Sequence, residues 1–157
     1  LAGKSFLDLF ACSGQVGIEA LSRGCSPVVF NEKERRRYEF IRGLLGEWGE
    51  DGEGVLLFNF PASRCMRLMH SRGVRFDYIF LDPPYEKTRG RVPVYRGVLE
   101  EIDRHDLLAP AGGAIVQHYV HNEMEESIGS LRLVDHRVYG TNALAFYERT
   151  EAITPAE

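Results

Sequence analysis

The stretch SFLDLFACSGQVG, residues 5–17, decides the fold class of this chain of 157 residues. Its first half is a short apolar run, which predicts a buried strand, and Gly14 then breaks that run. From Gly17 onward, Ile18 and Leu21 follow at the spacing of one helix face. A strand that turns through glycine straight into a helix is typical of an α/β fold with a mostly parallel sheet.

The rest of the chain repeats this alternation of apolar strands and amphipathic helices and then closes with two strands around Gly140-Thr141-Asn142, which predict a hairpin. We expect a Rossmann-like three-layer sandwich with a mostly parallel sheet of seven strands, in which the last strand inserts between its predecessors. Residues 1–149 are expected to form one domain, and residues 150–157 a loose tail. The expected strands are 5–10, 27–31, 55–58, 76–81, 113–119, 131–139 and 143–148, and the expected helices are 17–23, 33–45, 63–70, 94–104 and 123–128.

Composition excludes several classes of protein. Apolar residues make up 44% and charged residues 27%, which argues against a disordered or fibrous chain. No run approaches the roughly 18 apolar residues of a membrane helix. The chain has 19 Lys and Arg residues and 23 Asp and Glu residues, which gives a net charge of −4. Binding of nucleic acid would therefore need a local basic patch.

The three cysteines, Cys12, Cys25 and Cys65, are odd in number and lack a C-x-x-C spacing. This pattern argues against a disulfide framework or a zinc site, and it suits the reducing cytosol. We therefore expect no metal. Because the chain starts at Leu1, immediately before the first strand, we also expect that residues once preceded it.

The glycine turn is the first candidate ligand site, because the carboxyl end of such a strand exposes backbone N–H groups and a helix N-terminus. In the G-x-G-x-x-G pattern of dinucleotide-binding proteins, Cys12 would stand at the first glycine and Gly14 and Gly17 at the other two. A ligand that contains a pyrophosphate therefore remains an alternative. Asp8 favours a cationic ligand instead, since a carboxylate inside the strand would repel a pyrophosphate. Glu32, at the end of the second expected strand, can accept both hydroxyls of a ribose.

The second candidate site is Asp82-Pro83-Pro84-Tyr85, directly after the apolar strand 76–81. Two prolines remove two N–H donors and leave backbone carbonyls free. A carboxylate beside such a carbonyl offers two acceptors, which complement the two donors of an exocyclic NH₂ group. Tyr85 adds a flat face on which a base drawn out of its stack can lie.

With these motifs the chain resembles S-adenosylmethionine-dependent class I methyltransferases that act on exocyclic amino groups. LDLFACSGQVGIEALSRG (7–24) together with FDYIFLDPPY (76–85) is similar to the RsmD-type 16S rRNA guanine-N2 methyltransferases. The resemblance covers most of the chain, including the turn at 139–141 and the strand at 145–147. It implies S-adenosylmethionine as cofactor, N2 of a guanine in 16S rRNA as target, and a cytoplasmic monomer acting on the small ribosomal subunit or its assembly intermediate.

The resemblance also assigns residues. The catalytic group comprises Asp82, Pro83, Pro84 and Tyr85, and cofactor binding falls to Asp8, Phe10, Ala11, Cys12, Ser13, Gly14, Glu32, Lys33, Asn59 and Phe60. The basic stretch after Tyr85 predicts phosphate contacts by Lys87, Arg89, Arg91 and Arg96. Two features depart from the family: it usually has glycine where Cys12 stands, and it begins with a basic segment that this chain lacks.

Other functions share parts of this pattern. A DNA adenine-N6 or cytosine-N4 methyltransferase would use the same Asp-Pro-Pro-Tyr chemistry, but the short chain has no evident target-recognition domain. A protein glutamine methyltransferase usually has Asn where Asp82 stands. A non-catalytic RNA-binding module that kept the fold is the alternative from a different class.

Overall fold

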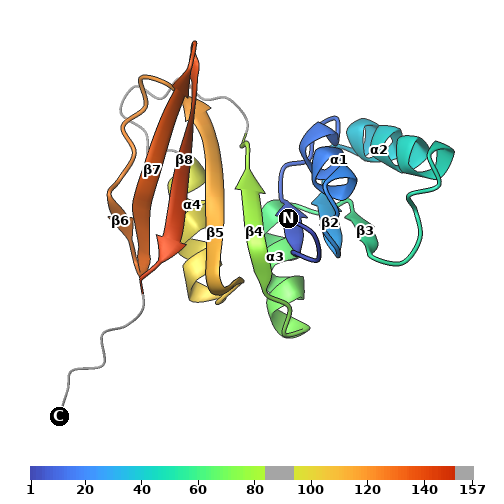
Figure 1. Cartoon of the computed structure of the whole chain (residues 1–157), viewed down its shortest axis with the longest axis horizontal. Helices are drawn as coiled ribbons and strands as arrows, with labels where there is room; N and C mark the ends of the chain where they lie inside the picture. Colours follow the sequence, from blue (N-terminus) through green and yellow to red (C-terminus); the bar gives the residue numbers. More distant parts are fainter. Residues whose placement is uncertain (84–93, 151–157) are drawn as a thin grey trace.

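The computed structural model describes residues 1–83 and 94–150, which form one sheet with helices on both faces (Figure 1). The helices are α1 (Gln15–Ser22), α2 (Arg35–Glu47), α3 (Ala62–Ser71) and α4 (Val94–Arg104). The strands are β1 (Phe6–Asp8), β2 (Val28–Asn31), β3 (Val55–Phe58), β4 (Phe76–Leu81), β5 (Leu108–Tyr119), β6 (Ser127–Ile128), β7 (Leu131–Tyr139) and β8 (Asn142–Arg149).

The sheet order is β3-β2-β1-β4-β5-β8-β7-β6. Strands β1 to β5 are parallel to one another, and β8 runs antiparallel between β5 and β7. The expected insertion of the last strand is therefore confirmed. This order places β1 between β2 and β4, with Leu7 opposite both Val29 and Ile79, so the carboxyl ends of these three strands are neighbours.

The strands alternate their apolar side chains between two cores, one on each face of the sheet. Leu7 and Ile79 pack with α3 and α4, which contribute the buried Met66 and Leu99. On the other face, a second core forms against α1 and α2. Two helix layers around one sheet are the expected three-layer architecture.

A glycine joins α1 closely to the sheet. At Gly17 an added Cβ would lie 2.2 Å from Cε1 of the Phe30 ring, so only glycine lets the first turn of α1 approach β2 this closely. The helix N-terminus is thereby held next to the ends of β1 and β2.

One expected element is wrong. Residues 123–128 do not form a helix; they contain the short strand β6, which pairs with β7 and makes the sheet eight-stranded rather than seven-stranded. Tertiary hydrogen bonds explain the difference, because the Tyr95 hydroxyl donates to the carbonyl of Glu123 and the Tyr147 hydroxyl to that of Glu125. In a helix over these residues the Glu123 carbonyl would accept a backbone N–H instead of the Tyr95 hydroxyl.

Strand β5 also begins at Leu108, five residues before the expected start at Gly113, and the register against β4 shifts between Phe76 and Tyr78. Among the described residues, no helix is both long and apolar enough to span a bilayer.

Candidate active site

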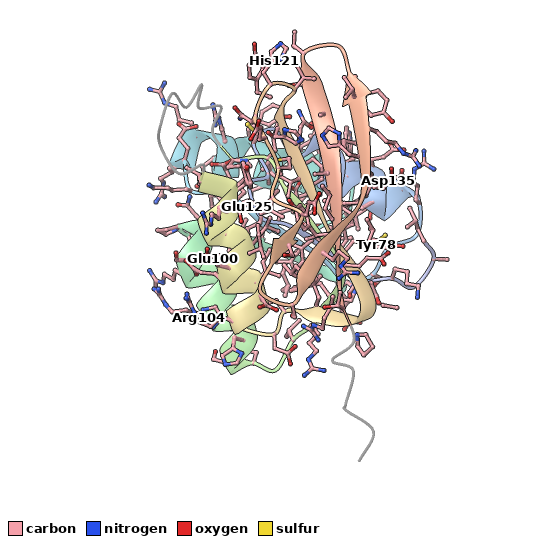
Figure 2. All side chains as sticks on the ribbon, turned by 90° about the vertical axis from the view of Figure 1, so that its left-hand side faces the viewer. Tyr78, Glu100, Arg104, His121, Glu125 and Asp135 are labelled. Atoms are coloured by element: carbon pink, nitrogen blue, oxygen red, sulfur yellow. The ribbon has the colours of Figure 1, made fainter. Side chains whose placement is uncertain are left out.

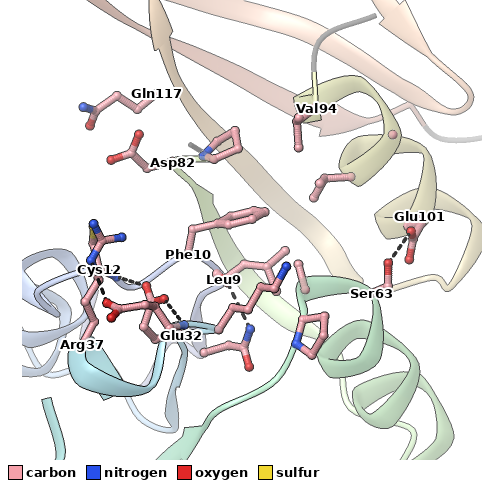
Figure 3. Close-up of a pocket in the computed structure, with 18 of the residues that line it drawn as sticks. Leu9, Phe10, Cys12, Glu32, Arg37, Ser63, Asp82, Val94, Glu101 and Gln117 are labelled. Carbon is pink, nitrogen blue, oxygen red and sulfur yellow. Dashed lines mark hydrogen bonds and ion pairs between the residues drawn. The ribbon is translucent and has the colours of Figure 1, made fainter. Parts of the chain in front are cut away.

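A cleft of about 1200 Å³ opens at the carboxyl ends of the parallel strands (Figure 3). Its walls come from the segments after β1, β2 and β4, from the first turn of α3 and from one side of α4. In Figure 3, Phe10 lies between Asp82 and Glu32. The residues assigned from the sequence that line the cleft are Phe10, Cys12, Glu32, Lys33, Asp82 and Pro83.

Glu32 is held rigidly by the backbone around it. One carboxylate oxygen accepts the N–H of Cys12 at 2.8 Å, and the other accepts the N–H of Glu34 at 2.8 Å. The side chain is buried apart from the face that lines the cleft. A carboxylate has about four acceptor positions, so acceptor capacity remains for two hydroxyl donors in the cleft.

Asp8 lies behind the cleft wall and does not line it. It is 1% exposed; one oxygen accepts the N–H of Gly17 at 3.1 Å, while the other, Oδ1, has no hydrogen-bond partner among the described residues. Burial raises the pKa of Asp8 to about 7, against the opposing effect of the Gly17 N–H, and the carboxylates of Asp82 and Glu32 add to the rise. These three acidic groups create a negative field that favours a cationic ligand.

Asp82 follows β4 at the cleft rim, and Pro83 lines the cleft next to it. Partial burial raises the pKa of Asp82 above its ordinary value. Pro84, Tyr85, Lys87, Arg89 and Arg91 lie outside the described residues, so their assignments remain predictions.

The turn between β1 and α1 has an unusual backbone. Cys12 has φ +57° and Gly14 has φ +82°, and only glycine adopts such values without strain. The buried Ala11 donates its N–H to the Asn31 carbonyl at 2.9 Å and accepts the Gly14 N–H at 2.7 Å. Ala11, Ser13 and Gly14 do not line the cleft, so in this structure they shape the turn that presents Cys12.

Replacing Cys12 by glycine is expected to leave binding of S-adenosylhomocysteine unchanged or to tighten it, because glycine relieves the positive φ and clears the cleft wall. Titration calorimetry measures this directly. Cys12→Ala is the matched control, since it keeps the Cβ and removes only the thiol. A marked loss of affinity in both variants would show that the thiol itself has a role.

Asn59 and Phe60 brace the cleft from outside. The Asn59 amide donates to the carbonyls of Glu32 at 2.7 Å and Lys33 at 3.0 Å, and the Phe60 N–H donates to the Asn31 side chain at 3.3 Å. Neither residue lines the cleft. Their contacts hold the chain that carries Glu32 and Lys33.

Arg96 lies on α4 and forms ion pairs with Glu100 at 3.2 Å and Glu125 at 2.9 Å. Its charge is therefore compensated within the protein, which weakens the case for a phosphate contact.

Several cleft residues were not predicted from the sequence, because they belong to separate helices and strands. These are Arg37, Ser63, Glu101, Gln117 and Asn142 among others, and Ser63 donates to Glu101 at 2.9 Å.

The family model described as conserved hypothetical protein 95 (Cons_hypoth95) matches residues 1–148. The chain belongs to this family. The matched residues include the whole sheet except the last residue of β8, and they include every cleft residue described above.

Curated relatives agree with this membership. YlbH of Bacillus subtilis (strain 168), whose name gives it a provisional assignment as an rRNA methyltransferase, is 30% identical over 94% of this chain and 77% of its own length. Ribosomal RNA small subunit methyltransferase D of Escherichia coli (strain K12) is 27% identical over 91% of this chain and 67% of its own length.

Solved structures share the fold of this family member. A conserved hypothetical protein of Streptococcus pyogenes superimposes with a TM-score of 0.80 at 28% identity, covering 94% of this chain and 86% of the other. SMU.776, a provisional methyltransferase complexed with SAH, superimposes with a TM-score of 0.71 at 14% identity, covering 93% and 45%. The second likeness shows the fold alone.

Proposed function

We propose that this protein is an S-adenosylmethionine-dependent rRNA methyltransferase, and that it modifies the exocyclic N2 amino group of a guanine in 16S rRNA. The observation that carries the proposal is the meeting of Asp82, Pro83 and Glu32 in one cleft, with the buried Asp8 behind it. The names of the B. subtilis and E. coli relatives support rRNA as the substrate class. Residues 1–149 would form the catalytic domain.

The cleft residues fit a positively charged nucleoside ligand. Glu32 has acceptor positions left for two ribose hydroxyls after binding the N–H groups of Cys12 and Glu34. Asp8, whose Oδ1 has no hydrogen-bond partner in the described part of the chain, and the nearby Asp82 provide the negative field that a sulfonium and an ammonium group require. When bound there, S-adenosylmethionine would supply a methyl group activated by its sulfonium.

Asp82 and the Pro83 carbonyl would act on the target amine. The lone pair of an aromatic amine is delocalised into the ring, which makes the nitrogen a weak nucleophile. If Asp82 and Pro83 accept its two hydrogens, the nitrogen becomes more pyramidal and its lone pair can point at the methyl carbon. The Asp82 carboxylate also stabilises the positive charge that develops on the nitrogen during transfer.

The decisive experiment measures transfer of a labelled methyl group to small ribosomal subunits, naked 16S rRNA and double-stranded DNA, followed by mapping of the modified base. We expect label on the N2 atom of one guanine of 16S rRNA and none on DNA. Label on adenine N6 or cytosine N4 of DNA would overturn the proposal. Thermal stabilisation by S-adenosylhomocysteine checks the cofactor separately, since a non-catalytic module that lost the cofactor would show no shift.

A further inference from the structure

The segment from Pro61 to Phe76, which contains α3, holds four arginines and no acidic residue. Arg64, Arg67, Arg72 and Arg75 are all exposed. A local charge of +4 is unusual in a chain whose net charge is −4. We call Arg64, Arg67 and Arg72 the basic stripe; Arg75 is left out because it pairs with Asp106.

The charges of the basic stripe are not compensated within the described part of the protein. Among residues 1–83 and 94–150, none of the three arginines has a carboxylate within ion-pair distance. On α2, by contrast, Arg35 and Arg42 both pair with Glu39. Uncompensated, exposed guanidinium groups remain available to an external anion.

The basic stripe begins at the rim of the active-site cleft. Pro61, Ala62 and Ser63 line the cleft, and Arg64 is the next residue. The Arg64 guanidinium lies over the Phe60 ring, 4.4 Å from its centre, and Phe60 in turn stacks on Phe58 with ring centres 5.4 Å apart. Both rings are partly buried, and arginine beside a partly buried aromatic ring also occurs on surfaces that bind single-stranded nucleic acid.

Helix α4 carries one cation near the basic stripe, Arg104, and the acidic Glu100, Glu101 and Asp103 lie on the same helix. Figure 2 shows Arg104 at the end of α4, which packs beside α3. Burial first, and then the nearby His70, Arg104 and Arg67, lower the pKa of His105. Of the acidic groups nearby, Asp106 pairs with both Arg75 and Arg149, whereas Glu101 accepts from the neutral hydroxyl of Ser63 and has no Arg or Lys partner among the described residues.

We propose that the basic stripe binds the phosphate backbone of substrate RNA and leads it to the cleft. This inference rests on the proposed function, and it places a docking surface for RNA on α3 and at Arg72, directly after its C-terminal end. Phosphate contacts fix the register of a nucleic acid without reading its sequence. A stripe that starts at the cleft rim can therefore position the strand while cleft residues select the base.

The test replaces the three arginines together, as Arg64→Gln, Arg67→Gln and Arg72→Gln, and measures affinity for a 16S rRNA transcript across a salt series. We expect affinity to fall at least about tenfold and the slope of log K against log salt to flatten by about 2. The matched control removes three exposed, ion-paired arginines, one directly after α1 and two on α2, as Arg23→Gln, Arg35→Gln and Arg42→Gln. This control should change the slope little.

Two further readouts separate the possible failures. S-adenosylhomocysteine should stabilise the wild type and both triple variants equally, which shows that the variants fold and keep the cleft. If the wild type methylates RNA but the stripe variant keeps full affinity, the stripe serves another acidic partner and this inference is overturned. Equal losses in both triple variants would likewise overturn it, since bulk charge would then suffice. If the wild type neither binds nor methylates RNA, the proposed function itself fails.

Discussion

Replacing Asp82 by alanine is expected to lower the rate of methyl transfer at least about 100- to 1000-fold, the usual cost of removing one preorganised group that stabilises transition-state charge. Asp82→Asn should be nearly as damaging, because its NH₂ group would present donors where the target amine needs an acceptor. Both variants should bind S-adenosylhomocysteine within a few-fold of the wild type, since Glu32 and the glycine turn are untouched. Single-turnover assays with saturating RNA measure the rate, and calorimetry measures binding.

Glu34→Gln is a suitable control, because it also removes a carboxylate that lines the cleft, one to which no catalytic role is assigned. A near-native rate in the Asp82 variants would show that the assigned role is wrong. The pH profile offers an independent check. Transfer needs ionised Asp82, and burial raises the pKa of that group. The rate of the wild type should therefore fall with decreasing pH at a higher pH than an ordinary aspartate would cause.

Asp8→Asn is expected to stabilise the ligand-free protein at alkaline pH and to make its stability less dependent on pH. Burial raises the pKa of Asp8 to about 7 in the folded protein, whereas the unfolded chain releases the proton near the ordinary pKa of 3.8. Stability therefore falls as pH rises from about 4 to 7 and is then constant. Asparagine stays neutral throughout, so the variant should gain about 2–4 kcal/mol over the wild type at pH 8 and almost nothing at pH 4.

Urea unfolding at pH 4, 6 and 8 measures this difference. The exposed Asp51 provides the control, and Asp51→Asn should leave the pH profile unchanged. If the difference in free energy of unfolding between Asp8→Asn and the wild type is the same at all three pH values, ionisation of Asp8 does not destabilise the folded protein. If the cofactor assignment is right, the same variant should bind S-adenosylmethionine more weakly, because the negative field behind the cleft is lost.

Sequence patterns were most accurate where short-range forces dominate. Short apolar runs predicted β3 and β4, and an amphipathic stretch predicted α4, all with their observed bounds, because these patterns are encoded in neighbouring residues. They failed at residues 123–128, where hydrogen bonds from Tyr95 and Tyr147, far away in the chain, hold the segment in an extended form. No local pattern carries such contacts.

For the candidate site, too, some features could be predicted from the sequence and others only from the tertiary structure. The amino-acid sequence by itself placed Asp8 inside the first strand, Glu32 at the end of the second and Asp82 directly after the fourth, because positions relative to apolar runs can be read from consecutive residues. The structure ends β1 at Asp8. Only the tertiary structure decided which of them face the cleft: strand order brings β1, β2 and β4 together, and close packing then buries Asp8 while leaving Asp82 and Glu32 accessible. Likewise, the sequence shows the arginines of the basic stripe, but only the fold decides that none of them has an ion-pair partner among residues 1–83 and 94–150.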